Sequence, residues 1–248
     1  MQSKKYSITT YTCLLILTVI FNKMERRHFL ISSVLSLGLI SQRTYGSTPK
    51  TSMSFDVLLN DEIVGYSNLT HKKHKNGLEV LIDIEITPKF LGLKFMKYTL
   101  KNREVWKKKK LMSIDANSSW FGKRYYVKGQ REKGGFRIEG SAFSGVIKDT
   151  FATTSYFTPE FLKRRIWVST QDGKPLEIKT RKLRNRKVSF NDKDYSVTEW
   201  EISGDLELTL QYDQHKNWVG SGFTVGNYPA RFILNNRKNN IHKIWQNS

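Results

Sequence analysis

The sequence predicts an all-β protein, a long antiparallel meander curled into an open or closed barrel with one short helix at its mouth. The clearest observation is residues 78–87, where leucine, valine and isoleucine alternate with mostly polar residues. Side chains alternate across a strand, so this segment has one buried face and one wet face. The same alternation recurs between closely spaced turns, which is typical of a continuous antiparallel sheet. Only one segment carries clear helix signals.

The first half of the chain consists of alternating segments that we expect to be strands. Asn76-Gly77 is a strong hairpin signal before the third of them. Pro88 ends that strand, because proline cannot donate a hydrogen bond to a strand ladder. The next strand is expected to bend at Gly92. The expected strands are residues 55–59, 63–71, 78–87, 93–106, 111–120, 124–131 and 136–140.

The single helix is expected at residues 158–165. Thr158 can cap its first turn, Pro159 suits the first helical position, and Glu160 favours the positive end of the helix dipole. We expect the helix to plug or cross an opening of the sheet. Its apolar side would be Phe161, Leu162 and Ile166, and its basic end Lys163, Arg164 and Arg165.

The second half of the chain returns to alternation after a turn at residues 171–174. The expected strands are residues 176–180, 188–190, 195–203, 206–212, 218–225 and 228–234. We therefore expect one β-rich domain at residues 47–234. Residues 235–248 are expected to form a polar C-terminal tail that frays.

Residues 1–46 are expected to be a signal segment. Their two apolar patches, residues 11–21 and 29–40, are shorter than the roughly 20 residues that span a bilayer. Met24 is an alternative start, which would make residues 1–23 an over-extension. A two-helix membrane anchor is the other interpretation, disfavoured by the basic residues between the patches. Export to the periplasm or cell envelope follows.

The start of the second patch resembles the twin-arginine export motif. The residues that carry this likeness are Arg26, Arg27, Phe29 and Leu30. Glu25 and Ile31 depart from the fullest form of the motif, so ordinary secretion stays open. Cleavage is expected after Gly46.

The charge is strongly basic, with 42 Lys and Arg against 22 Asp and Glu, a net +20. Residues 1–46 hold six basic residues and one acidic residue, which leaves 36 and 21, or +15, for residues 47–248. Such a field attracts polyanions. For an exported protein we expect anionic lipid head groups or acidic surface polymers and peripheral membrane contact, not nucleic acid; solubility alone is the alternative. Cys13, the one cysteine, lies in the leader, so the mature chain has no thiol chemistry.

No sequence signature of catalysis stands out. There is no nucleophile-elbow, phosphate-loop or zinc-protease pattern. His71 and His74 lack further ligands at metal-binding spacing. Asp83 and Glu85 share what we interpret as a solvated outer face. We therefore predict no cofactor and no metal, and we identify no catalytic residue.

One expected strand carries polar residues on its apolar face. Within residues 93–106, the candidate ligand-binding residues on that face are Tyr98, Asn102, Glu104 and Trp106. A carboxylate turned inward must be paired or hydrogen-bonded, or its pKa rises. Polar groups inside an apolar lumen also orient ligands. We favour the structural alternative, in which Glu104 pairs with a neighbouring Lys or Arg near the barrel mouth.

Residues 55–234 resemble an uncharacterised family of exported bacterial β-rich proteins. The segments that carry the resemblance are Glu104-Val105-Trp106, Thr170-Gln171-Asp172-Gly173, Ser203-Gly204-Asp205-Leu206, and Tyr212-Asp213 before Trp218-Val219. These are turn and strand patterns, so the resemblance implies a fold and no chemistry. More distantly, the meander is similar to the curved half-barrels of periplasmic lipoprotein carriers, an analogy of fold alone.

The expected function is non-covalent binding of an amphipathic or lipid-like ligand in the curved sheet. The concave face would hold acyl chains, and a basic rim would meet an anionic head group. The candidate rim residues are Lys107, Lys108, Lys109 and Lys110 in one turn, and Lys163, Arg164 and Arg165 in another. The alternatives are an envelope enzyme with an unrecognised site, or a module that binds another envelope protein along an edge strand. A wide dry cavity favours the ligand-binding protein, a polar cleft around Glu104 favours the enzyme, and a filled lumen favours the interaction module.

Overall fold

A computed structural model describes residues 53–74, 77–90, 93–94, 97–148, 150–190, 193–225, 227–238 and 241–246. The expected signal segment, its twin-arginine-like motif and its cleavage position lie outside the described residues. So does the expected bend at Gly92.

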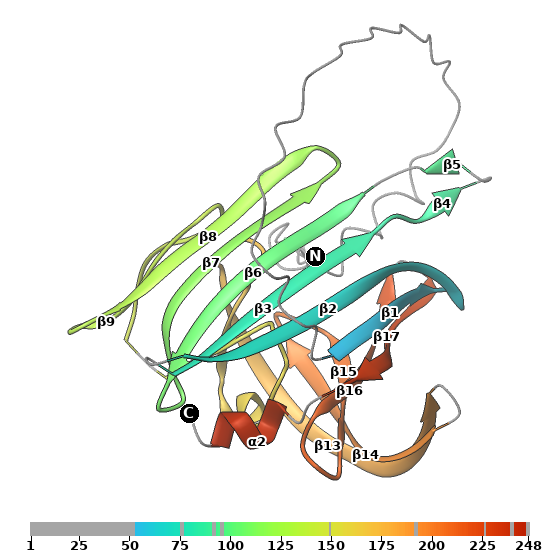
Figure 1. The fold of residues 1–248 in the computed structure, drawn as a ribbon. Coiled ribbons are helices and arrows are strands. Elements are labelled where there is room, and N and C mark those ends of the chain that lie inside the picture. Colours follow the sequence, from blue (N-terminus) through green and yellow to red (C-terminus); the bar gives the residue numbers. More distant parts are fainter. Residues whose placement is uncertain are drawn as a thin grey trace, which may run out of the picture.

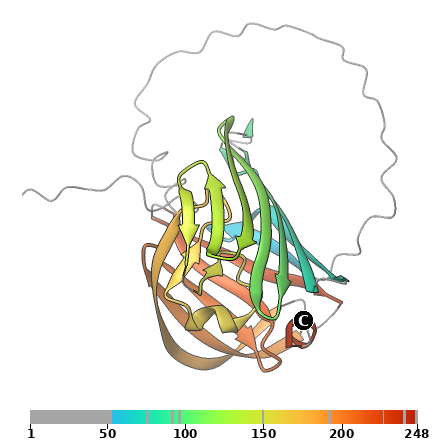
Figure 2. The ribbon, with the colours of Figure 1, turned by 90° about the vertical axis from the view of Figure 1, so that its left-hand side faces the viewer.

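The chain forms one long sheet that curls on itself (Figures 1 and 2). Its fifteen strands follow the order β10-β9-β8-β7-β6-β3-β2-β1-β17-β16-β15-β14-β13-β12-β11. The short pair β4–β5 stands apart from this sheet. In chain order the strands are β1 (Met53–Leu59), β2 (Glu62–His74), β3 (Gly77–Ile86), β4 (Lys89–Phe90), β5 (Leu93–Lys94), β6 (Tyr98–Lys107), β7 (Lys110–Trp120), β8 (Lys123–Glu132), β9 (Gly135–Gly140), β10 (Ser144–Ile147), β11 (Ala152–Thr153), β12 (Ile166–Val168), β13 (Pro175–Phe190), β14 (Lys193–Gly204), β15 (Leu208–Asp213), β16 (Trp218–Val225) and β17 (Tyr228–Arg237).

The sheet is antiparallel except where β11 meets β12. It is not closed, because β10 and β11 are its two edges and do not pair with each other. The prediction of an all-β meander curled into a barrel-like shape is thus confirmed. The predicted alternation is confirmed in β3, where Leu78, Val80 and Ile82 are buried in the core.

An inner segment, residues 150–174, bridges the two edges of the sheet. The backbone amide of Ala142 donates to the carbonyl of Asp172 at 2.9 Å. The Ser118 hydroxyl of β7 donates to the carbonyl of Gln171 at 3.3 Å. From the other half of the sheet, the Tyr212 hydroxyl donates to the carbonyl of Tyr156 at 2.9 Å. The segment therefore ties both halves of the sheet together from within.

The predicted helix at 158–165 is a shorter 3₁₀ helix, η1 (Pro159–Lys163). Its start is as expected, since the Thr158 hydroxyl accepts a hydrogen bond from the Glu160 amide. Phe161 and Leu162 are buried as expected, but Ile166 belongs to β12. The helix ends early because the chain returns to extended structure at Arg164 and pairs with β13.

Strand β13 is longer than the sequence indicates, since it joins the two expected strands at 176–180 and 188–190. Residues 181–187 between them are all exposed, so no alternation of burial marks this part of the strand. Backbone pairing with β14 holds it, and ion pairs cross the ribbon from Arg181 to Glu201 and from Arg184 to Glu199.

The expected frayed tail at 235–248 differs from the structure. Strand β17 continues to Arg237, and helix α2 (Ile241–Gln246) follows. Ile241 and Trp245 are fully buried against the core, which overrides the polar composition of the segment.

The curled sheet has two distinct ends, which lie apart in Figure 1. We call the end with η1, α2 and the turn between β6 and β7 the helix end. We call the end with β4–β5, where β3 finishes and β6 begins, the hairpin end. Strand β6 runs from Tyr98 at the hairpin end to Trp106 at the helix end.

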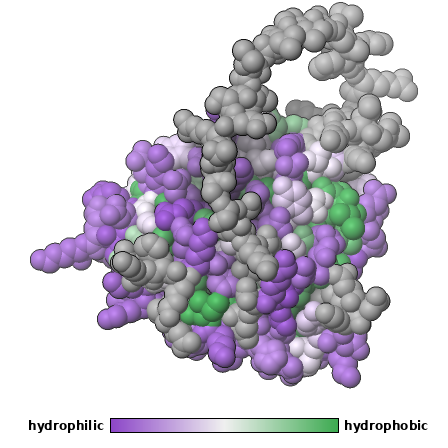
Figure 3. Space-filling model, viewed as in Figure 1, coloured by the Kyte–Doolittle hydropathy of each residue, from purple (hydrophilic) through white to green (hydrophobic). Residues whose placement is uncertain are grey.

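The face seen in Figure 3 is mostly polar where its residues are coloured, with a few separate hydrophobic patches. Among the described residues, the most exposed large apolar side chains are Ile63, at 69%, and Phe121, at 50%. Within the described part of the chain, no helix has the length and apolar character needed to cross a bilayer.

Candidate functional site

The four candidate residues of β6 all point into the interior. Tyr98, Asn102, Glu104 and Trp106 are buried, while Lys101 and Arg103 between them are exposed. Alternation along one strand explains this arrangement. Because the strand runs the length of the barrel, however, the four residues do not share one site. Tyr98 lies at the hairpin end, and the other three lie deeper towards the helix end.

Glu104 forms the centre of a buried hydrogen-bond network. Its Oε1 accepts from Nδ2 of Asn102 at 2.9 Å, and its Oε2 accepts from Nε1 of Trp106 at 2.7 Å. The Ser155 hydroxyl of the inner segment also donates to Oε2 at 3.2 Å and lies 2.7 Å from the Thr153 hydroxyl. Burial raises the pKa of the Glu104 carboxyl, and these hydrogen bonds oppose the rise only in part.

The expected Lys or Arg partner of Glu104 is not found. No basic side chain of the described residues forms an ion pair with Glu104, and the groups around it are neutral. Asn102 Oδ1 is buried with no hydrogen-bond partner. If the Asn102 amide turns over, Oδ1 faces Glu104 and accepts a hydrogen bond from a protonated carboxyl. The site therefore suits a protonated, neutral carboxyl group, which can be buried without a cation beside it.

Aromatic rings fill the space around this network. The Trp106 ring lies 5.1 Å from Phe161, 5.2 Å from Trp245 and 6.0 Å from Phe157, measured between ring centroids. All four side chains are almost fully buried. Glu104 has no exposed surface, so within the described residues the polar cleft that would favour an enzyme is not formed there.

The hairpin end is hollow by contrast. Two mainly apolar cavities, of about 40 and 70 Å³, share the side chains of Ile84, Tyr98, Phe223 and Phe232. Ile84, Phe223 and Phe232 are only partly buried although they belong to the inner wall. The interior is therefore less completely packed towards the hairpin end than at the helix end.

The two expected basic rims do not border these cavities. The turn with Lys107, Lys108, Lys109 and Lys110 lies at the helix end, about 30 Å along β6 from Tyr98 at roughly 3.3 Å per residue. There Lys109 binds Glu160 at 3.1 Å and Gln246 at 3.2 Å, which ties the turn to both helices.

Lys163, Arg164 and Arg165 line a separate groove of about 1140 Å³ together with Lys179. This groove shares no lining residue with the apolar cavities. The basic residues thus form their own surface feature.

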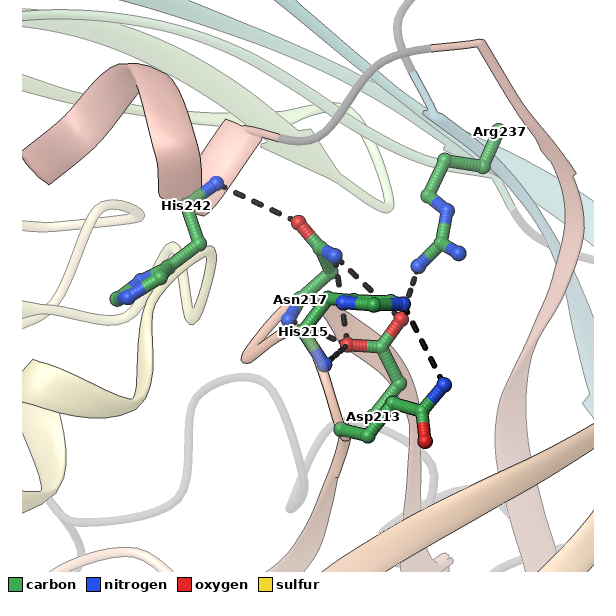
Figure 4. A network of polar contacts seen from close by, with 6 residues as sticks. Asp213, His215, Asn217, Arg237 and His242 are labelled. Carbon is green, nitrogen blue, oxygen red and sulfur yellow. Dashed lines mark hydrogen bonds and ion pairs between the residues drawn. The ribbon is translucent and has the colours of Figure 1, made fainter.

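A second buried polar network, at Asp213, was not predicted as a site (Figure 4). Asp213 forms an ion pair with Arg237 of β17 and accepts the backbone amides of His215 at 2.9 Å and Asn217 at 2.8 Å. The Asn217 side chain in turn accepts the backbone amide of His242 in α2 at 3.3 Å. Asp213 thus fixes a turn, a strand end and α2 at once. An Asp followed by polar residues signals such a turn, but its long-range partners leave no local signal.

No group of three or more His, Cys, Asp or Glu side chains in the described residues is placed to hold a metal ion. The candidate site is formed by the two apolar cavities towards the hairpin end.

The structure defines an open, barrel-like all-β domain whose interior is filled at one end and hollow at the other. The family model described as a domain of unknown function, DUF6134, matches residues 55–235, and the chain belongs to this family. The expectation of an uncharacterised β-rich family is confirmed. No curated protein matches the sequence significantly.

A solved structure supports the fold. The crystal structure of a beta-barrel-like protein of the domain of unknown function DUF1849, from Brucella abortus, matches with a TM-score of 0.51. It is 6% identical, and the match covers 73% of this chain and 94% of that one. At this identity the likeness concerns the fold alone.

Proposed function

We propose that the protein binds one apolar chain end of an amphipathic, lipid-like ligand in the hollow hairpin end of the curled sheet. The observation that carries this proposal is the pair of adjoining apolar cavities, walled by side chains that remain partly exposed on the inner face. Burial of hydrocarbon against such a wall is favourable by roughly 25 cal/mol per Å².

The size of the cavities limits what can enter. Together they are smaller than the roughly 150 Å³ cavity that admits a benzene ring. A chain end fits this space, whereas a whole lipid does not. The rest of the ligand would lie outside the barrel, where its head group meets water.

A matched pair of isoleucines tests the proposal. Ile84 lines both cavities, whereas Ile63 is 69% exposed on the outer face. We expect Ile84→Trp to fill the cavities and to weaken binding of a fluorescent fatty-acid probe at least tenfold, and Ile63→Trp to leave it unchanged. Energy transfer from Trp120 and Trp218, which also line the cavities, reports the binding. If neither variant changes binding, the probe does not enter the barrel. If the unaltered protein binds no probe, an interaction module with a filled lumen becomes the better interpretation.

We further propose export to the periplasm or cell envelope and contact with anionic lipid. The motif at Arg26 and Arg27 and the net charge of +15 for residues 47–248 support this. Fractionation with N-terminal sequencing should find Ser47 as the first residue in the envelope fraction, and replacement of both arginines by lysine should retain the precursor.

Binding to anionic vesicles should weaken with salt, since exposed charges are screened beyond about 10 Å at 0.1 M. An intact N-terminus in the cytosol, or equal binding to neutral vesicles, contradicts these proposals.

A further inference from the structure

The wall of the larger cavity is mainly apolar but includes polar side chains, of which Gln171 is the only amide among the described residues. Gln171, in the inner segment, lines this cavity and is 3% exposed. Its side-chain Nε2 and Oε1 both lack a hydrogen-bond partner among the described residues. A buried amide left unpaired in this way is costly, and such groups are rare in native proteins.

The backbone holds Gln171 in place. Its carbonyl accepts the Ser118 hydroxyl at 3.3 Å, and its amide donates to the Ser169 hydroxyl at 3.3 Å. The neighbouring hydroxyls of Thr154 and Thr170 bind each other at 3.0 Å. The side-chain amide is thus positioned on the wall while its two polar atoms remain available.

The described residues that line this cavity include no Asp, Glu, Lys, Arg or His. An ionised group would therefore enter without a counter-charge, which is strongly unfavourable in a buried site. An uncharged group that both donates and accepts hydrogen bonds would satisfy both atoms of the Gln171 amide.

We propose that Gln171 is a specificity-determining residue that binds an uncharged donor–acceptor group, such as a carboxamide, on the inserted part of the ligand. This inference rests on the proposed function and adds the chemistry of the ligand to it. The cavity would then prefer a chain that carries an amide over a plain hydrocarbon chain of equal length.

Two isosteric probes test the inference on the full chain. Hexanamide and 2-heptanone have the same pentyl chain and carbonyl group, but only hexanamide can donate a hydrogen bond. Their affinities are measured by displacement of the fluorescent fatty-acid probe. In Gln171→Leu we expect the ratio of hexanamide to 2-heptanone affinity to fall about tenfold relative to the unaltered protein, as expected for loss of one net hydrogen bond. Gln171→Met repeats the test with a more flexible side chain, and Gln214→Leu, in an exposed turn, should leave the ratio unchanged.

The outcomes separate the two proposals. If both probes bind and the ratio is the same in Gln171→Leu, the role of Gln171 is overturned while the apolar site stands. If neither probe binds to the unaltered protein, the apolar site itself is wrong.

Thermal unfolding adds an independent result. Gln171→Leu should be as stable as the unaltered protein or more so, since it removes two unpaired polar atoms; a clear loss of stability would mean that the amide already has partners and would overturn the inference.

Discussion

The helix end and the hairpin end are built from the same curled strands, yet they bury their inner side chains to different degrees. On β6, Trp106 is 1% exposed and packs against three other rings. On β7, Trp120 also faces the interior but stays half-buried, with Tyr98 and Phe121 as its ring neighbours. Two helices cover the helix end, whereas the hairpin end keeps cavities. The difference indicates that the helix end contributes more of the packing that stabilises the fold, whereas the hairpin end is where we propose that a ligand binds.

The largest expected effect concerns the two tryptophans, one at each end of the barrel. Trp106→Ala should lower the free energy of unfolding by about 3–5 kcal/mol, the usual cost of removing a large buried ring. Trp120→Ala, its matched control at the hairpin end, should cost only about 1–2 kcal/mol because its side chain is only partly buried. Chemical denaturation of both variants measures the two values. Equal losses would show that the two ends are packed alike.

A second comparison concerns two Asp–Arg ion pairs. Asp213→Ala should cost about 3 kcal/mol, since it leaves Arg237 and the amides of the 213–217 turn without their acceptor. Asp61→Ala removes an equivalent pair with Arg231, but Asp61 is 76% exposed, so we expect at most about 1 kcal/mol. Asp213→Ala should also increase hydrogen exchange of α2, because the backbone amide of His242 in this helix donates to the Asn217 side chain. If α2 exchanges as before, Asp213 does not anchor it.

Much of the filled core was predictable from the sequence, because alternation depends only on neighbours along the chain. Residues 78–87 were assigned the correct strand and face on that basis. The inward direction of Glu104 followed from the same parity. The sequence predicts two strands in place of β13 because its middle section has no buried face; backbone pairing with β14 and the ion pairs across it maintain this section.

The partners of the buried polar groups were not predictable. Ser155 donates to Glu104 across 51 residues of sequence, so the neutral network around the acid depends on where the inner segment passes. Gln171 was not predictable either, because only the tertiary structure shows that its side-chain amide lines a cavity without a hydrogen-bond partner. Helix α2 is only six residues long, and its burial comes from the tertiary contacts of Trp245.

A smaller effect is expected at Glu104. Because no cation depends on this carboxyl, Glu104→Gln should change the free energy of unfolding by less than about 1 kcal/mol at pH 4.5. Burial raises the pKa of the folded carboxyl above 4.5, so from that pH upward the unfolded chain ionises before the folded one does. The unaltered protein should therefore lose stability relative to the variant as the pH rises from 4.5. Unfolding curves at several pH values test this; a loss of several kcal/mol at every pH would reveal a hidden basic partner.

The smallest expected effect is at His242, which joins α2 to η1. Its Nδ1 lies 3.4 Å from the Thr158 hydroxyl, and its Nε2 lies 3.1 Å from Nε2 of Gln246, an arrangement that suits a neutral ring which donates through Nδ1 and accepts at Nε2. Burial lowers the pKa of His242 below 6.5, and Lys216 and Lys109 lower it further against the opposing carboxylates of Glu160 and Asp213.

As the pH falls below 6.5, the unfolded chain takes up a proton at His242 before the folded protein does, so the folded state loses stability. His242→Gln keeps a donor and an acceptor but cannot titrate. We expect the free energies of unfolding to differ by less than about 1 kcal/mol at pH 8, where His242 is neutral in both the folded and the unfolded state. As the pH falls from 6.5 towards the folded pKa, the variant should become more stable relative to the unaltered protein. Thermal unfolding of both proteins between pH 5 and pH 8 measures the difference. A difference that does not vary with pH would show that the helix end holds the charged ring as readily as the neutral one.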